Sequence, residues 1–195
     1  MKHYCWVLAF LPLYLHSQIP TPPPYVPMGV EDKLKVHVNR VIQPTNFLKS
    51  AAGAGIQQLR DTPREWGQGA EGYGKRVGSS VAFGAAKNMV QFAMDSTLHE
   101  DPRYFPTGKK SVKERAIYAA LQAVRCRTDS GRTRFAYSRV GSALSAGFIS
   151  NVWEPDRVAT VPQAFVRAAE SIGLDAGSNV FKEFWPDIKK KLRRK

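Results

Sequence analysis

Cysteine, acidic residues and long apolar runs are scarce in this chain of 195 residues, and each scarcity excludes a class of protein. Its two cysteines, Cys5 and Cys126, cannot form the disulfide framework of a small secreted scaffold. No apolar run reaches about 18 residues, the length at which a segment by itself qualifies as a membrane-spanning helix. The 16 acidic residues stand against 29 lysines and arginines, and the net charge of +13 favours anionic partners.

The first 17 residues have the pattern of an export signal. Lys2 and His3 precede an apolar run from Tyr4 to Leu15, and Ser17 is a small residue at which cleavage could occur. A run of about 12 residues lies within the signal-peptide range, and the alternative is a segment that lies on a membrane. We expect an exported protein in the periplasm or at the outer membrane, where a nucleic-acid partner is not expected.

Export would leave Cys126 as the one cysteine of the mature chain. Its neighbours Arg125 and Arg127 could lower the pKa of the thiol and make it reactive. The favoured alternative is a half-buried cysteine at a helix end, because free cysteines are commonly buried.

Composition divides the chain into four regions. These are a signal peptide (1–17), a proline-rich spacer with an ambiguous first element (18–43), a helical domain (44–187) and a basic tail (188–195). The spacer sequence PTPPPYVP should be extended. Residues 31–42 alternate like a strand but also present a helical face, and we favour a helix.

Helical patterns follow one another from Pro44 onward and predict an all-α fold, a closely packed helical bundle with glycine and alanine at the helix interfaces. Helices are expected over about 45–60, 73–99, 111–126, 140–153 and 160–185. Capping boxes at Thr62 and Ser111 indicate helix starts, and Pro102, Pro155 and Pro186 indicate ends. Residues 128–131 should form a turn. Residues 67–74 fit either a loop or a loosened first turn.

Small residues recur at every fourth position in the longest of these helices, at Ala70, Gly74, Gly78, Ala82 and Ala86. This spacing forms a groove that a second helix backbone can approach closely. A glycine costs a helix about 1 kcal/mol relative to alanine, so we expect close packing to offset that cost. Gly173 and Gly177 repeat the spacing in the last helix. We predict that the chain itself fills the groove, with membrane contact as a secondary use.

The same helix is apolar on most of its circumference. Its polar residues form one narrow strip of Arg76, Ser80, Lys87 and Gln91. A helix this apolar is expected to be buried on most sides or to lie against lipid.

Three catalytic motifs are matched without the structural context that their chemistry needs. Residues 67–72 match GxGxxG, but no strand is predicted before them. Residues 69–75 begin like a P-loop, but Arg76 replaces the hydroxyl residue that binds magnesium, which leaves only a weak anion-binding role for Lys75 and Arg76. Ser145 lies in a variant nucleophile elbow without a strand or a histidine base. We predict no catalytic residue, no cofactor and no metal.

His99, Glu100, Asp101 and Arg103 form a candidate polar site. Adjacent residues point in different directions, so we do not expect them to share a metal ion. An enzyme acting on an envelope polymer would place all four around a concave pocket and shield a carboxylate from water. The favoured alternative is a helix end with local ion pairs.

A block of cations ends the chain. It consists of Lys189, Lys190, Lys191, Arg193, Arg194 and Lys195. Such a block is usually solvated and disordered, and it suits anionic surfaces. A module that binds an anionic polymer through this tail is therefore a further hypothesis.

Four strings resemble an uncharacterised family of exported bacterial helical proteins. They are DTPREWGQGAEGYGKR from Asp61, HEDPRYF from His99, GSALSAGFISN from Gly141 and EFWPDI from Glu183. The resemblance covers about residues 44–188. It implies an exported bacterial origin and an all-helical domain, and it carries no activity and no catalytic residues.

Together these features favour a non-catalytic protein of the bacterial cell envelope. We expect it at a membrane surface or inside an envelope complex, with the envelope membrane or a membrane protein as its partner. Assembly with further copies of the chain remains open.

Overall fold

The computed structural model describes residues 25–109 and 111–193. The predicted signal peptide (1–17), the first part of the spacer (18–24), Arg194 and Lys195 lie outside the described residues.

The described residues form an all-α fold that is 71% helical, as the sequence predicts. Their elements are α1 (Val30–Ile42), α2 (Pro44–Leu59), the 3-10 helix η1 (Arg64–Trp66), α3 (Gly69–Thr97), α4 (Val112–Leu121), β1 (Arg125–Arg127), β2 (Thr133–Phe135), α5 (Tyr137–Ile149), the 3-10 helix η2 (Ser150–Val152) and α6 (Val161–Leu192).

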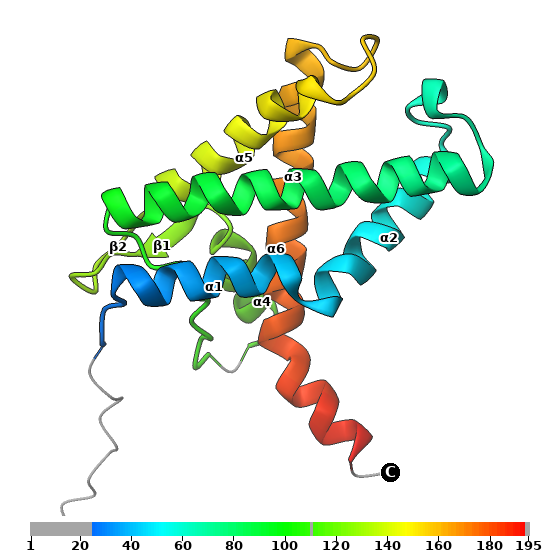
Figure 1. Ribbon diagram of the computed structural model, residues 1–195. Coiled ribbons are helices and arrows are strands. Elements are labelled where there is room, and N and C mark those ends of the chain that lie inside the picture. The colour runs from blue at the N-terminus through cyan, green and yellow to red at the C-terminus, as the bar shows by residue number, and fades with distance from the viewer. Residues whose placement is uncertain (1–24, 110, 194–195) are drawn as a thin grey trace, which may run out of the picture.

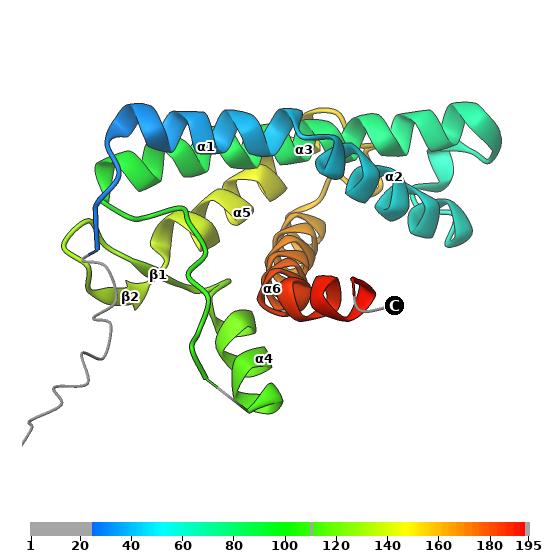
Figure 2. The same cartoon turned by 90° about the horizontal axis from the view of Figure 1, so that it is seen from below.

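The long helix α3 organises the fold. Helices α1 and α2 follow one another along α3, and α5 crosses it and packs against α6 (Figure 1). Helix α4 packs against α6 and lies apart from α1 and α3 when the molecule is seen from below (Figure 2). Helix α1, the ambiguous element of the sequence, is thus a helix packed on the body of the protein. Its acidic first turn (Glu31, Asp32) and Arg40 in its last turn suit the helix dipole.

The sequence left open whether residues 67–74 form a loop or the first turn of a helix, and the structure places most of them in the first turns of α3. The capping box predicted at Thr62 is not formed, because no side chain caps the three-residue η1 that follows Pro63, and α3 begins only at Gly69. Gly67 and Gly69 have φ angles of 67° and 88°, a backbone conformation that glycine adopts without strain.

Residues 125–135 form a short hairpin where a helix end was predicted. Helix α4 ends at Leu121 rather than near 126, and Cys126 pairs with Arg134 across the β1–β2 ladder. The predicted turn at 128–131 connects these strands. Strands of three residues are too short to produce an alternating pattern that sequence can reveal.

The prediction that Pro186 ends the last helix is wrong, because α6 continues to Leu192. A proline inside a helix removes one backbone hydrogen bond and bends the helix. Figure 2 shows the last turns of α6 running at an angle to the rest. Lys189, Lys190 and Lys191 therefore belong to a helix and not to a disordered tail.

The distribution of burial is inverted with respect to an ordinary water-soluble domain. The buried apolar residues of the described chain are eight alanines, Cys126 and the prolines at 63 and 102. Across residues 25–109 and 111–193, every Val, Leu, Ile, Phe, Met, Tyr and Trp retains some exposure to solvent. Leu, Ile, Val and Phe usually fill the core of a domain this large. Here the interior is made of small residues and of charged ones.

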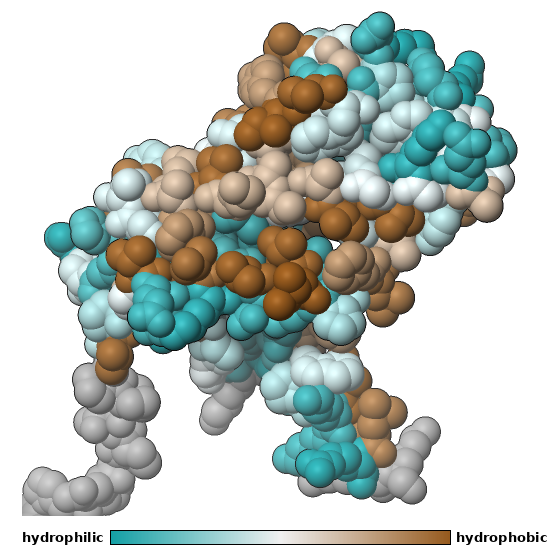
Figure 3. Space-filling view, in the orientation of Figure 1, coloured by the Kyte–Doolittle hydropathy of each residue, from teal (hydrophilic) through white to brown (hydrophobic). Residues whose placement is uncertain are grey.

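Helix α1 illustrates the inversion. It buries Lys33 and His37 against the protein. Its apolar stripe of Val30, Leu34, Val38 and Ile42 faces outward, with exposures between 43% and 61%. A row of brown side chains along α1 marks this stripe in Figure 3.

Helix α3 repeats the arrangement. The narrow polar strip predicted for this helix faces the interior of the protein. Its residues Arg76, Lys87 and Gln91 are buried, whereas Met89 is 73% exposed. Lys87 reaches α6, where its Nζ donates to the Ser171 hydroxyl at 2.7 Å and lies 2.6 Å from an Asp175 oxygen.

The prediction that the chain fills the small-residue groove is wrong at its glycines. Ala70, Gly74 and Gly78 are exposed, and Ala82 and Ala86 are only half-buried. A Cβ added at Gly74, Gly78, Gly173 or Gly177 would meet no atom of the described residues within 4 Å. Use of the groove by a separate partner stays a prediction.

Close packing through small residues occurs instead where α5 crosses α6. A Cβ on Gly147 would lie 2.3 Å from the carbonyl oxygen of Ala164, so the two backbones nearly touch. Ala143, Ala146 and Ala168 complete the buried contact.

Candidate functional site

The four residues of the predicted polar site do not converge. His99 projects into solvent, with 76% of its side chain exposed, and its Nδ1 lies 3.3 Å from an Asp129 oxygen. Glu100 and Asp101 are fully buried but belong to separate sets of contacts. The pocket expected of an enzyme is therefore not formed by His99, Glu100, Asp101 and Arg103.

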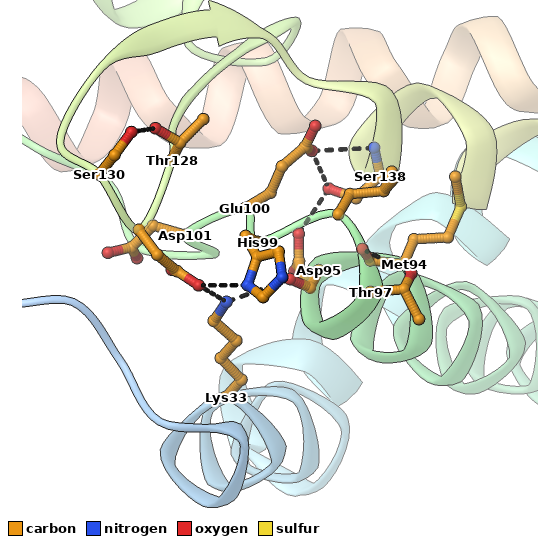
Figure 4. A network of polar contacts seen from close by, with 12 residues as sticks. Lys33, Met94, Asp95, Thr97, His99, Glu100, Asp101, Thr128, Ser130 and Ser138 are labelled. Atoms are coloured by element: carbon orange, nitrogen blue, oxygen red, sulfur yellow. Dashed lines mark hydrogen bonds and ion pairs between the residues drawn. The ribbon is translucent and has the colours of Figure 1, made fainter.

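Glu100 lies in a buried polar chain that joins α1, α3 and α5 (Figure 4). The Ser138 hydroxyl stands between two carboxyl groups, 2.5 Å from Asp95 and 2.6 Å from Glu100. The other oxygen of Asp95 lies 2.9 Å from Nε2 of His37. His37 Nδ1 in turn lies 3.1 Å from the amide oxygen of Asn88.

The contacts of Glu100 come from hydrogen-bond donors. The backbone N–H groups of Tyr137 and Ser138 donate to Glu100 at 3.2 and 3.0 Å, and Arg134 forms an ion pair with it at 3.0 Å. Glu100 therefore acts as an acceptor that ties the start of α5 to the loop after α3.

The cluster has the residue types of a hydrolase triad but not its geometry. In a triad the serine is bonded to the histidine, whereas here Asp95 separates Ser138 from His37. Ser138 is fully buried and has no access to a substrate. Ser145, the other candidate nucleophile, lies inside α5 and not at a strand-to-helix elbow. This network of buried hydrogen bonds thus holds α1, α3 and α5 together.

Asp101 anchors the chain before α1. Its carboxylate accepts hydrogen bonds from the Tyr25 hydroxyl at 2.7 Å and from Arg103 at 2.6 Å. Burial alone would raise the pKa of Asp101, but the hydrogen bonds from Arg103 and Tyr25 outweigh it and lower that pKa below its usual value. Burial, together with Asp101, raises the pKa of Tyr25 to about 12.

Arg76 and Cys126 are also structural. Arg76 is fully buried and donates to the carbonyls of Thr62 at 2.8 Å, Gly67 at 2.8 Å and Pro63 at 2.8 Å, so it closes the loop before α3 and cannot bind an anion. Burial, reinforced by the charge of Glu100, raises the pKa of the Cys126 thiol to about 12. The hypothesis of an activated cysteine is therefore wrong.

A second polar cluster fixes the loop after α3 and α4 to α6. The Glu183 carboxylate accepts from the Tyr104 hydroxyl at 2.6 Å, from the Thr107 N–H at 3.2 Å and from Arg115 at 3.0 Å. Arg115 also pairs with Asp187 at 2.7 Å. Burial would raise the pKa of Glu183, but the hydrogen bonds from Tyr104 and Arg115 reverse this and lower it.

This shift predicts acid sensitivity at the α4–α6 contact. Because the folded pKa of Glu183 is below the usual value of about 4.3, its stabilising effect is complete above that pH and is lost as the pH falls through the folded pKa. We expect Glu183→Gln to lower the melting temperature at pH 7 and the difference from the unmodified chain to shrink below about pH 4. Thermal unfolding followed by circular dichroism across this range measures it. The exposed Glu114→Gln is the control, and a difference for Glu183→Gln that is independent of pH contradicts the prediction.

Open hollows occur on the described surface away from the predicted polar site. One, of about 430 Å³, is lined by Trp66, Lys75, Gly78, Ser79, Ala82 and Trp153, next to the exposed half of the small-residue groove. Another, of about 480 Å³, lies between α4 and the end of α6, and Lys190 and Lys191 are among its lining residues.

No group of three or more His, Cys, Asp or Glu side chains within 25–109 and 111–193 is placed to hold a metal ion. None of the helices in that part of the chain has a stretch long and apolar enough to cross a membrane. Comparison with protein-family models, with curated proteins and with solved structures finds no match. Function is therefore inferred from the geometry alone.

Proposed function

We propose that this protein is a non-catalytic structural component of the bacterial cell envelope, associated with a membrane or built into an envelope complex. The observation that carries the proposal is the inverted distribution of burial. Large apolar side chains are exposed on α1, α2, α3 and α6, whereas charged groups such as Lys33, Arg76 and Glu100 are buried and hydrogen-bonded.

Exposed apolar side chains are common singly, but a contiguous apolar face usually marks contact with a membrane or with another protein. The stripe of Val30, Leu34, Val38 and Ile42 on α1 is exposed, and so are Phe47 and Leu48 of α2. In apolar surroundings polar groups turn inward and pair with one another, as Lys33, His37 and Asp95 do here. Lipid or a partner protein would cover the outward face.

The buried polar groups support a structural role. Ser138, Glu100 and Asp95 are fully buried, and each is occupied by contacts that join helices. They cannot reach a substrate without unfolding. This favours a scaffold over the polymer-modifying enzyme that the sequence left open.

Cell fractionation tests the proposal. We expect the full chain, expressed in a bacterial host with its own N-terminus, to sediment with the envelope after osmotic lysis and to remain there after a wash in high salt. A periplasmic marker enzyme controls for trapping. Recovery of the protein as a monomer in the periplasmic or cytosolic supernatant would contradict the proposal.

A further inference from the structure

The last turns of α6 form an amphipathic helix. Phe181, Trp185, Ile188 and Leu192 follow one another at spacings of four, three and four, which places them in one stripe along the helix. Their exposures lie between 38% and 66%. This end projects beyond the other helices, and brown atoms lie beside teal ones on it in Figure 3. The stripe has no covering element in the part of the chain that the structure describes.

Cations border this stripe on both sides. At about 100° per residue, Lys189 falls on one side of it and Lys191 on the other. Lys190 and Arg193 add two further exposed cations. The Lys189 ammonium lies 5.1 Å from the centre of the Trp185 ring, over its face. Asp187 is the last acidic residue of the sequence, so the final turns carry positive charge only.

The hollow between α4 and α6 extends the apolar surface. Its lining consists of Val112, Phe184, Ile188, Lys190 and Lys191 together with the ion pair of Arg115 and Asp187. The Arg115–Glu183 ion pair at 3.0 Å fixes α6 to α4 beside it. The apolar surface of this hollow and the ammonium groups of Lys190 and Lys191 therefore lie next to one another at the end of α6.

We propose that residues 181–193 form an anchor that lies in the headgroup region of an anionic bilayer. The stripe would enter the boundary of the acyl chains, and the lysines on both sides would extend to the phosphates. A protein groove for this helix would need acidic walls on both sides, whereas a sheet of anionic headgroups meets both rows of cations at once. This inference rests on the proposed envelope function and names the membrane contact within it.

Flotation with vesicles tests the anchor. The full chain is mixed with vesicles of phosphatidylcholine alone or of phosphatidylcholine and phosphatidylglycerol at roughly 7:3. We expect strong binding to the anionic vesicles only. Each lysine contributes about 1 kcal/mol at such a surface, so changing Lys189, Lys190 and Lys191 to Gln should weaken binding at least about tenfold. Changing Trp185 and Leu192 to Ser should weaken it by a similar factor.

Two matched variants control for charge and for apolar surface. Lys35, Lys75 and Lys113 are exposed lysines on other helices, and their triple change to Gln removes the same charge. Ile149 of α5 and Val152 of η2 are exposed outside the helices that carry the outward apolar face, and their double change to Ser removes similar apolar surface. All variants should retain the far-ultraviolet circular dichroism of the unmodified chain, since every altered side chain is exposed.

Loss of binding in both α6 variants and its retention in both controls supports the anchor. Equal binding of all variants to vesicles overturns the anchor but leaves the envelope function intact, because another face then makes the contact. Loss in the lysine variant alone also overturns it and indicates plain attraction to polyanions. Absence of vesicle binding in a protein that still fractionates with the envelope overturns it in favour of a protein partner.

Discussion

Replacing Gly147 by alanine should destabilise the fold, although alanine favours helices. The new Cβ would lie 2.3 Å from the carbonyl oxygen of Ala164 and 3.2 Å from the carbonyl carbon. Both are backbone atoms, which cannot rotate away as a side chain can. Overpacking of this kind costs about 1–3 kcal/mol, more than the helix propensity gained. For a domain of this size we expect the melting temperature to fall by roughly 2–10 °C. Thermal unfolding followed by circular dichroism measures it.

The same substitution at Gly177 is the matched control. Gly177 also lies inside a helix, and its Cβ would meet no described atom within 4 Å. Gly177→Ala should therefore stabilise the chain by about 0.5–1 kcal/mol. Gly78→Ala, in the exposed groove of α3, should behave in the same way in the isolated protein. Destabilisation of similar size at all three positions would show that the helices are packed differently.

The second large effect is expected in the buried polar chain. Asp95→Ala removes the group between His37 and Ser138, so Nε2 of His37 loses its buried partner and Ser138 keeps only its contact with Glu100. Breaking a buried charged contact in this way typically costs about 3–5 kcal/mol. We expect a loss near that size in urea unfolding. The exposed Asp156→Ala should stay within about 0.5 kcal/mol of the unmodified chain.

Amide variants separate the roles of the two carboxyl groups. Asparagine at 95 can accept from His37 and donate to Ser138, which can then donate to Glu100, so Asp95→Asn should be milder than Asp95→Ala. Glutamine at 100 would direct an N–H group toward donors from Arg134, Tyr137 or Ser138. We therefore expect Glu100→Gln to cost more than Asp95→Asn in urea unfolding. The reverse order would contradict the role of Glu100 as an acceptor on all sides.

The positions of helices and turns could largely be predicted from the sequence, because prolines, glycines and helix-capping residues mark them locally. The turn at 128–131 and the helix that ends before Pro102 are examples. Two helix ends are exceptions. Helix α4 ends before the hairpin at 125–135, and α6 continues past Pro186, where contacts of Glu183 with Tyr104 and Arg115 hold α6 against α4.

The faces of the helices could not be predicted, because hydropathy patterns assume that water is outside. The strip of Arg76, Lys87 and Gln91 has the composition of a solvated face, but its partners are distant in the sequence, as with Asp175 on α6. Small-residue packing was expected in this fold and occurs at Gly147, not in the α3 groove. The spacing of small residues on one helix does not identify the helix that meets them. The residues from His99 to Arg103 were separated in the same way, since Glu100 contacts Ser138 of α5 whereas Asp101 contacts Tyr25, which lies before α1.

The central claim is that the outward apolar face of this protein is covered in its working state. The most direct measurement is the molar mass of the purified full chain by light scattering in buffer without detergent, together with the binding of a dye that fluoresces on apolar surfaces. We expect the chain to assemble or to require lipid or detergent, and to bind the dye strongly when these are withdrawn. A monodisperse monomer of 21.7 kDa, or of the mature chain after signal cleavage, that binds no dye would contradict the account.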